Sequence, residues 1–315
     1  MITRNFRISK PHHYILFFVG LICVFLFQRL KDHSGIQSVD FLIESVAFLF
    51  FLTSIFLVVF IITKNKLTQK NSFAALYFFI FIFLMPQTLM DYKIIIANGF
   101  VLLSYRRIFS LETKLNIKKK YFDAAFWLSI AALFYAWSIL HFIPLLATIL
   151  LRPIDWLKHL FVLVFGAGAA GLLVFLFVSV FGVVPPILFF YLPEPNFDIF
   201  AQMSQLMAIS TLVLLVMLTG AIFRLFSPLI LKNSKSRNNF IVLFLMLFTG
   251  FSTSLLAANM FAENMLFLSF PFAVLMANFT QQQRRPWLSD LLLIVLLSLA
   301  FLNLGLIIEN QTSVY

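Results

Sequence analysis

The sequence predicts an all-α integral membrane protein, a polytopic helix bundle with about nine crossings and a re-entrant helical hairpin. Hydrophobic residues make up 62% of its 315 residues and charged residues 11%, whereas about 25% of the residues of a soluble domain are charged. Uncharged stretches long enough to cross a hydrocarbon core of about 30 Å recur along the chain. Because the connections between them are short, we expect residues 1–315 to form a single integral membrane domain without a soluble domain.

Successive hydrophobic stretches predict the helices in order. They cover 13–29, 41–63, 72–90, 93–105, 121–151, 160–183, 200–223, 240–260, 265–281 and 287–308. The fourth stretch is short for a crossing, and the fifth is long. We expect the first not to be a cleavable signal peptide, because Phe27, Gln28 and Arg29 stand where a cleavage site requires small residues.

The fifth stretch, residues 121–151, decides the topology. If it crosses the membrane once, the 23 Lys and Arg residues divide almost evenly between the two sides; if it enters and returns, 20 of the 23 lie on one side. The positive-inside rule favours the second arrangement, and the stretch is too short for two crossings of about 20 residues each. We therefore predict a hairpin of two short helices that turns near Tyr135–Ser138 and bends at Pro144. The N-terminus is then cytoplasmic and the C-terminus periplasmic.

The longest polar segment, Arg106–Lys120, mixes apolar residues with six basic residues. This pattern predicts a basic amphipathic segment that lies along the inner leaflet. Its candidate contacts with anionic lipids or with a partner protein are Arg106, Arg107, Lys118, Lys119 and Lys120.

The stretch GAGAAG, residues 166–171, fits the dinucleotide-binding pattern G-x-G-x-x-G. However, no charged residue occurs from Leu160 to Leu192, so the helix after the glycines has no solvent-exposed face. Gly166, Gly168 and Gly171 instead predict a strip for helix packing, where another helix or a lipid chain approaches closely. We expect no nucleotide or other cofactor and no nucleic-acid partner.

One part of the chain resembles a known enzyme module. The basic segment, the small-residue helix FDAAFWLSIAALFY, Pro144 and the closing LLRPIDW resemble the paired short helices of GT-C glycosyltransferases, which use polyprenyl-phosphate donors. Over most of its length, and most clearly from Ala97 to Trp156, the chain is also similar to an uncharacterised family of Bacteroidota inner-membrane proteins. Some members of that family are labelled beta-carotene monooxygenase.

The oxygenase label conflicts with the positions of the histidines. Non-haem iron in such an enzyme requires several clustered histidines or two histidines with a carboxylate. The predicted topology spreads the five histidines over both sides of the membrane and its interior: His12, His13, His33, His141 and His159. We therefore reject the label and expect no metal site.

The GT-C resemblance implies a catalytic carboxylate in the first outer loop, RLKDHSGIQSVD, where it would accept a proton from the acceptor hydroxyl. Asp32 is the matching position, with Arg29 and Lys31 available to a lipid phosphate. The loop is too short for the periplasmic helices that shape an acceptor site in those enzymes. The alternative is that these charges only mark the end of the first span.

Two polar residues are expected inside the bundle. Glu44 lies one turn into the second span, and an acid there is either functional or reaches outward to water. His141 lies within the hairpin near Tyr135 and Ser138 in helical spacing, and it requires a hydrogen-bond partner if it is buried.

These observations favour a non-catalytic, GT-C-like subunit of the bacterial inner membrane that binds a lipid or a partner protein in envelope biogenesis or export. Its expected partners are membrane lipids, polyprenyl phosphate among them, and a membrane protein complex. The alternative is an active polyprenyl-phosphate-dependent glycosyltransferase. A small transporter ranks third: prolines at 86, 144 and 271 favour broken helices, but the sequence lacks paired intramembrane charges and a visible inverted repeat.

The hairpin can be tested by cysteine labelling. In a chain with Cys23 replaced by serine, a single cysteine at position 158 should react with a membrane-impermeant maleimide only after the inner side is exposed. Labelling of that cysteine from outside intact cells would contradict the hairpin and the topology of every later helix.

Overall fold

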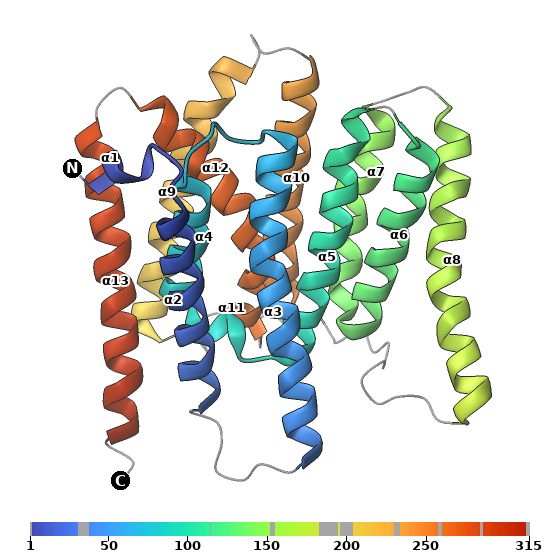
Figure 1. Cartoon of the computed structure of the whole chain (residues 1–315), viewed down its shortest axis with the longest axis horizontal. Coiled ribbons are helices and arrows are strands. Elements are labelled where there is room, and N and C mark those ends of the chain that lie inside the picture. The colour runs from blue at the N-terminus through green and yellow to red at the C-terminus, as the bar shows by residue number, and fades with distance from the viewer. Residues whose placement is uncertain are drawn as a thin grey trace.

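The computed structural model of the chain is a bundle of helices that run roughly parallel to one another (Figure 1). It describes residues 2–30, 38–113, 115–151, 155–182, 195, 204–229, 234–257, 260–283 and 286–312. The described secondary structure consists of α1 (Ile2–Phe6), α2 (Pro11–Leu30), α3 (Ser38–Asn65), α4 (Phe73–Leu84), η1 (Pro86–Leu89), α5 (Tyr92–Ser110), η2 (Leu111–Thr113), α6 (Ile117–Phe134), η3 (Ala136–His141), α7 (Phe142–Leu150), α8 (Trp156–Phe181), α9 (Gln205–Leu229), α10 (Ser234–Leu256), α11 (Phe261–Asn264), η7 (Met265–Leu268), α12 (Ser269–Gln282) and α13 (Pro286–Thr312).

Within the described residues, eight helical segments are long and apolar enough to cross a membrane. α4 is shorter, but the chain passes along it and η1 from one end of the bundle to the other (Figure 1). Together these segments give nine passes, and α6 to α7 adds the hairpin. The predicted fold class, an all-α polytopic bundle, is confirmed.

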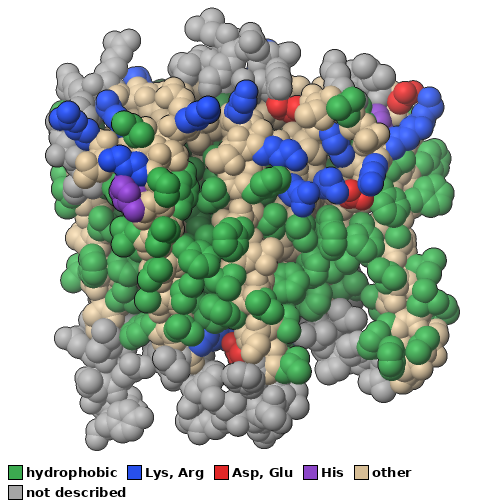
Figure 2. All heavy atoms as spheres, viewed as in Figure 1, with side chains coloured by type: hydrophobic (Ala, Val, Ile, Leu, Met, Phe, Trp, Pro, Cys, Tyr) green, Lys and Arg blue, Asp and Glu red, His purple; other side chains and the backbone are tan. Residues whose placement is uncertain are grey.

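The described helices place most connections that carry Lys and Arg at one end of the bundle. The adjoining ends of α3 and α4, α5 and α6, α7 and α8, α9 and α10, and α12 and α13 lie at the same end of the bundle as α1, whereas α13 ends at the opposite end (Figure 1). In the same view, Lys and Arg side chains gather along this end above a broad apolar band (Figure 2). We call it the basic end. That it faces the cytoplasm stays a prediction from the positive-inside rule.

The hairpin turns where the sequence placed it. α6 ends at Phe134, Tyr135 is extended (φ −144°, ψ 107°), and η3 leads into α7, which returns to the basic end. α6 is longer than expected, since 18 residues span about 27 Å. The predicted bend at Pro144 is wrong: Pro144 is the third residue of α7, where a missing N–H leaves no helical hydrogen bond unmade. The change of direction occurs before it, in η3.

The predicted surface segment at Arg106–Lys120 is also wrong. Arg106 and Arg107 belong to the last turns of α5, and the three lysines 118–120 begin α6. α5 is therefore a full 19-residue helix rather than the short stretch 93–105. Its start is fixed by Asp91, which caps the helix by accepting from the Lys93 amide at 2.6 Å. Its end continues into the basic residues because long Arg side chains bring their charges to the membrane surface.

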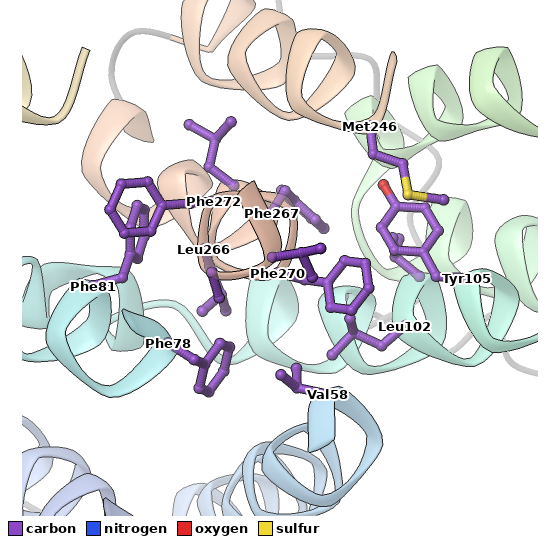
Figure 3. Close-up of a cluster of buried hydrophobic side chains, with 14 of the residues drawn as sticks. Val58, Phe78, Phe81, Leu102, Tyr105, Met246, Leu266, Phe267, Phe270 and Phe272 are labelled. Atoms are coloured by element: carbon purple, nitrogen blue, oxygen red, sulfur yellow. The ribbon is translucent and has the colours of Figure 1, made fainter. Parts of the chain in front are cut away.

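The centre of the bundle is the broken segment from α11 through η7 to α12. Within the span Phe261–Gln282, 94% of an apolar stretch of 18 residues is buried inside the protein. Phe267, Phe270 and Phe272 extend from it among side chains of α4, α5 and α10 (Figure 3). The corresponding share for α8 is 17%, so α8 lies at the edge of the bundle and packs mainly on α6.

The glycines of α8 differ from one another. A Cβ atom added at Gly166 would lie 2.6 Å from the Phe122 carbonyl oxygen of α6, whereas nothing lies within 4 Å of a Cβ added at Gly168 or Gly171. The close approach of α8 to α6 therefore depends on Gly166. The other two glycines face open space beside α8.

We expect Gly166→Leu to lower the thermal stability of the protein in detergent, because overpacking a close contact typically costs about 1–3 kcal/mol. Gly168→Leu serves as the matched control and should leave the melting temperature unchanged. Tryptophan fluorescence on heating measures both variants. Equal stability of the two would contradict the close packing of α8 on α6.

Candidate functional site

An apolar groove lies between α2 and α3, with α4 as its floor; we call it the α2–α3 groove. Its volume is about 320 Å³, within the range of about 300–1,000 Å³ that is typical of ligand pockets. A hollow is visible between the apolar side chains of α2 and α3 (Figure 2). The groove is lined by Tyr14, Ile15, Phe17, Phe18 and Leu21 of α2, by Ile55, Phe56, Val58 and Val59 of α3, and by Ala75 and Phe78 of α4.

The groove exists because α2 packs on α4 more closely than on α3. A Cβ atom at Gly20 would lie 2.6 Å from the Phe79 ring of α4, so the glycine lets the two helices approach. The small side chain of Ala75 then leaves the floor open between Val58 and Phe78, which are both buried. At the rim, Ile15 and Phe56 are each 63% exposed. The groove therefore opens at the side of the bundle.

Away from the basic end, the groove is closed by aromatic contacts and an ion pair. The Phe25 ring packs on Phe48 and Phe51 at centroid distances of 5.1 and 5.3 Å. Beyond them, Arg29 donates to the Glu44 carboxylate at 2.8 Å, and their side chains are 10% and 21% exposed. Glu44 thus meets an arginine from α2 rather than only water.

This ion pair changes the expectation for the first outer loop. Arg29 is bound to Glu44, whereas the GT-C resemblance assigned it to a lipid phosphate. Lys31 and Asp32 lie outside the described residues. Because removal of one partner would leave a poorly solvated charge, we expect the pair to hold α2 against α3 at this end.

At the basic end, the N-terminal segment is tied over the start of α4. The His13 Nδ1 atom lies 2.8 Å from the Ser72 hydroxyl, and the Ser72 amide donates to the Phe6 carbonyl at 3.1 Å. The Tyr14 hydroxyl lies 3.0 Å from Ser9 Oγ. Lys10 precedes α2 and is exposed. The groove mouth therefore combines an apolar interior with hydroxyl groups and a cation.

A second group of polar side chains lies deep in the bundle; we call it the His141 cluster. His141 is fully buried. Its Nδ1 atom lies 2.7 Å from the Tyr105 hydroxyl and 3.1 Å from Thr249 Oγ1, and its ring packs on Phe267 at 5.0 Å. Figure 3 shows the Tyr105 hydroxyl directed toward the helix that carries Met246. The partners of His141 thus come from α5 and α10, and not from Tyr135 or Ser138 as its helical spacing suggested.

The described residues leave several buried polar atoms near the hairpin turn without a hydrogen-bond partner. They are His141 Nε2, Ser138 Oγ, the Tyr135 hydroxyl and both amide atoms of Asn264. An unsatisfied buried polar group costs about 1–3 kcal/mol. Since ordered water commonly satisfies such groups, this region is suited to water rather than to a lipid chain.

The five basic residues expected to contact lipid or a partner have different surroundings. Arg107 pairs with Asp123 at 2.8 Å, and Arg106 lies over the Phe60 ring at 5.4 Å. Lys120 donates to the Ser110 carbonyl and the Thr113 hydroxyl. Lys118 and Lys119 are exposed. Three of the five therefore take part in internal contacts, which leaves Lys118 and Lys119 for an external anion.

The histidines do not gather at one place. His12 and His13 lie at the start of α2, His159 packs on Tyr121 at 4.8 Å near the start of α8, and His141 is central. His33 lies outside the described residues. Among the described residues, no group of three or more His, Cys, Asp or Glu side chains could hold a metal ion.

Sequence reasoning missed the α2–α3 groove. Its walls come from three helices, and the lining positions form no motif within any one of them. The one local signal was KPHHY, residues 10–14, where polar and aromatic residues begin the first span. The glycine strip predicted that a lipid chain could lie beside α8. The α2–α3 groove instead lies on the far side of α3 and α5 from α8 (Figure 1).

Comparison with known proteins yields one finding. The chain matches a family of unknown function (DUF6427) over residues 5–308. No curated protein and no solved structure matches it.

The His141 cluster can be tested by a double-mutant cycle. We expect Tyr105→Phe and His141→Leu each to destabilise the protein by about 1–3 kcal/mol, and the double variant to lose less than the sum, because both partners are then apolar. Tyr77→Phe is the matched control, since its hydroxyl bonds Thr280 at 2.6 Å and shares no partner with His141. Unfolding in denaturant measures all variants. Additive losses for Tyr105 and His141 would contradict the cluster.

Proposed function

The chain belongs to the DUF6427 family of unknown function, and we propose that it is a non-catalytic membrane subunit that binds a lipid chain in the α2–α3 groove. The groove itself is the observation that supports this function. Apart from the Tyr14 hydroxyl, its lining residues are apolar, and its rim opens toward the side of the bundle. In a membrane, that side is in contact with lipid.

A hydrocarbon chain is the ligand that such a groove favours. Water would find few hydrogen-bond partners there, whereas a chain gains dispersion contacts from three helices at once. A chain that lies only against the exposed face of α8 would contact one helix. A lipid chain in the groove would therefore be held by more contacts than a chain on the outer surface of the bundle.

The wider setting is proposed on sequence grounds. The resemblance to Bacteroidota inner-membrane proteins supports a place in the bacterial inner membrane, with the basic end in the cytoplasm and a role in envelope biogenesis or export. The exposed apolar face of α8, with Gly168 and Gly171 open, is available to a partner protein. The GT-C-like character of the hairpin belongs to the same proposal.

The alternative, a polyprenyl-phosphate-dependent glycosyltransferase, has less support. It requires Asp32 as general base and free cations for the lipid phosphate. Arg29 is bound to Glu44 at 2.8 Å, and Asp32 and Lys31 lie outside the described residues. The groove lining ends at Leu21, nine residues before α2 ends at Leu30, so a chain bound there takes its contacts from the described helices.

Photo-crosslinking tests the proposed function. The purified chain, reconstituted with phosphatidylcholine that carries a diazirine in one acyl chain, should be labelled on residues 14–21 and 55–59. Ala75→Phe fills the floor and should reduce this labelling several-fold, and Val59→Trp should do the same from the opposite wall.

Val164→Phe is the matched control, because it adds bulk at a position on α8 that is 69% exposed. It should leave labelling of the groove unchanged. Labelling spread evenly over the exposed helices, with no response to Ala75→Phe, would overturn the proposal.

A further inference from the structure

Building on the proposed function, we infer that the groove takes one chain of an anionic glycerophospholipid from the leaflet at the basic end, with the lipid phosphate against Arg7 and Lys10. Two separate features lead to this assignment. The first is the position of the groove along the bundle, and the second is the charge at its mouth.

The position of the groove selects the leaflet. Its α2 lining runs from Tyr14 to Leu21, and α2 begins at Pro11. Ten residues of helix rise about 15 Å, which is half of a hydrocarbon core of about 30 Å. On α3 the lining ends at Val59, six residues before the helix ends at Asn65. The groove therefore occupies the half of the membrane next to the basic end.

The opposite end of the groove is closed. Beyond Leu21, the Phe25 ring fills the space by packing on Phe48 and Phe51, and the Arg29–Glu44 pair follows. A chain that enters from the other leaflet would have to separate these contacts. A lipid whose headgroup lies at the basic end can place its chain in the groove without disturbing them.

The mouth carries two cations that form no ion pair among the described residues. Arg7 and Lys10 are exposed and form no ion pair with a described carboxylate. Among the described acids at the same end, Asp123 and Asp155 are paired with Arg107 and Lys158, and Asp290 accepts from the Thr3 amide at 2.7 Å. An anionic headgroup would supply the missing counter-charge, and basic residues near an anionic membrane surface are attracted to it.

The segment that carries these cations is fixed in place by hydrogen bonds. The Ser72 amide holds the Phe6 carbonyl, and the His13 ring meets the Ser72 hydroxyl at 2.8 Å. Tyr14, which lines the groove, lies 3.0 Å from Ser9. Arg7 and Lys10 therefore lie on a short segment that these hydrogen bonds hold at the groove mouth. Such preorganisation reduces the entropy lost when a ligand binds.

The experiment compares two lipids that differ in headgroup charge. The full chain is reconstituted in nanodiscs of phosphatidylcholine that contain equal, small fractions of diazirine-labelled phosphatidylglycerol or diazirine-labelled phosphatidylcholine. We expect labelling of residues 14–21 and 55–59 to favour phosphatidylglycerol by about fivefold or more. Arg7→Gln with Lys10→Gln should bring the ratio close to one and leave labelling by phosphatidylcholine unchanged.

Lys118→Gln with Lys119→Gln is the matched control, because these two exposed cations belong to α6 at the same end of the bundle. It should keep the preference. Equal loss in both double variants would overturn the inference in favour of a general surface effect. A preference of about one in the unaltered chain would also overturn it, while groove labelling by both lipids would leave the proposed function standing.

Two further outcomes separate the occupants. If neither lipid labels the groove, the proposed function fails as well. If unlabelled polyprenyl phosphate at equal mole fraction displaces phosphatidylglycerol from the groove, the assignment to a glycerophospholipid is wrong.

Discussion

Backbone groups inside a hydrocarbon core must find hydrogen-bond partners within the protein, and the arrangement of this bundle follows from that constraint. Three segments, η1, η3 and η7, interrupt helices and offer fewer regular hydrogen bonds. η3 and η7 both pack on α5 and α10, and η1 packs on η7 and α11. Long continuous helices such as α3 and α8 then take the positions at the edge, where lipid surrounds them.

The same division separates two kinds of interior. Around the hairpin turn, the His141 Nδ1 atom meets side chains from other helices, and neighbouring polar atoms have no hydrogen-bond partner among the described residues. Between α2 and α3, carbon atoms face an unfilled space. The bundle therefore contains a buried polar region near the hairpin turn and an apolar groove between α2 and α3. Of these two, only the groove opens at the side of the bundle.

The sequence was sufficient for features that depend on composition, length and charge. The number of passes, the turn after Phe134 and the common end of the basic connections followed from these quantities. Features that depend on contacts between distant residues did not follow. The partners of His141 come from positions 36 and 108 residues away, and of three similar glycines only Gly166 meets α6. The expected surface segment failed because the helical hydrogen bonds of α5 continue through Arg106 and Arg107, which charge patterning alone does not reveal.

The Arg29–Glu44 pair has a consequence for synthesis in the cell. Its two residues are separated by 15 positions and flank the first connection, so they meet as soon as α2 and α3 enter the membrane together. A paired arginine and glutamate carry no net charge, which lowers the cost of placing these two side chains near the hydrocarbon boundary. α4 is made later and covers the gap between α2 and α3 from behind. A lipid that binds there as proposed would have access to that gap before the third helix arrives, and because the groove opens at the side of the bundle, it would keep that access afterwards.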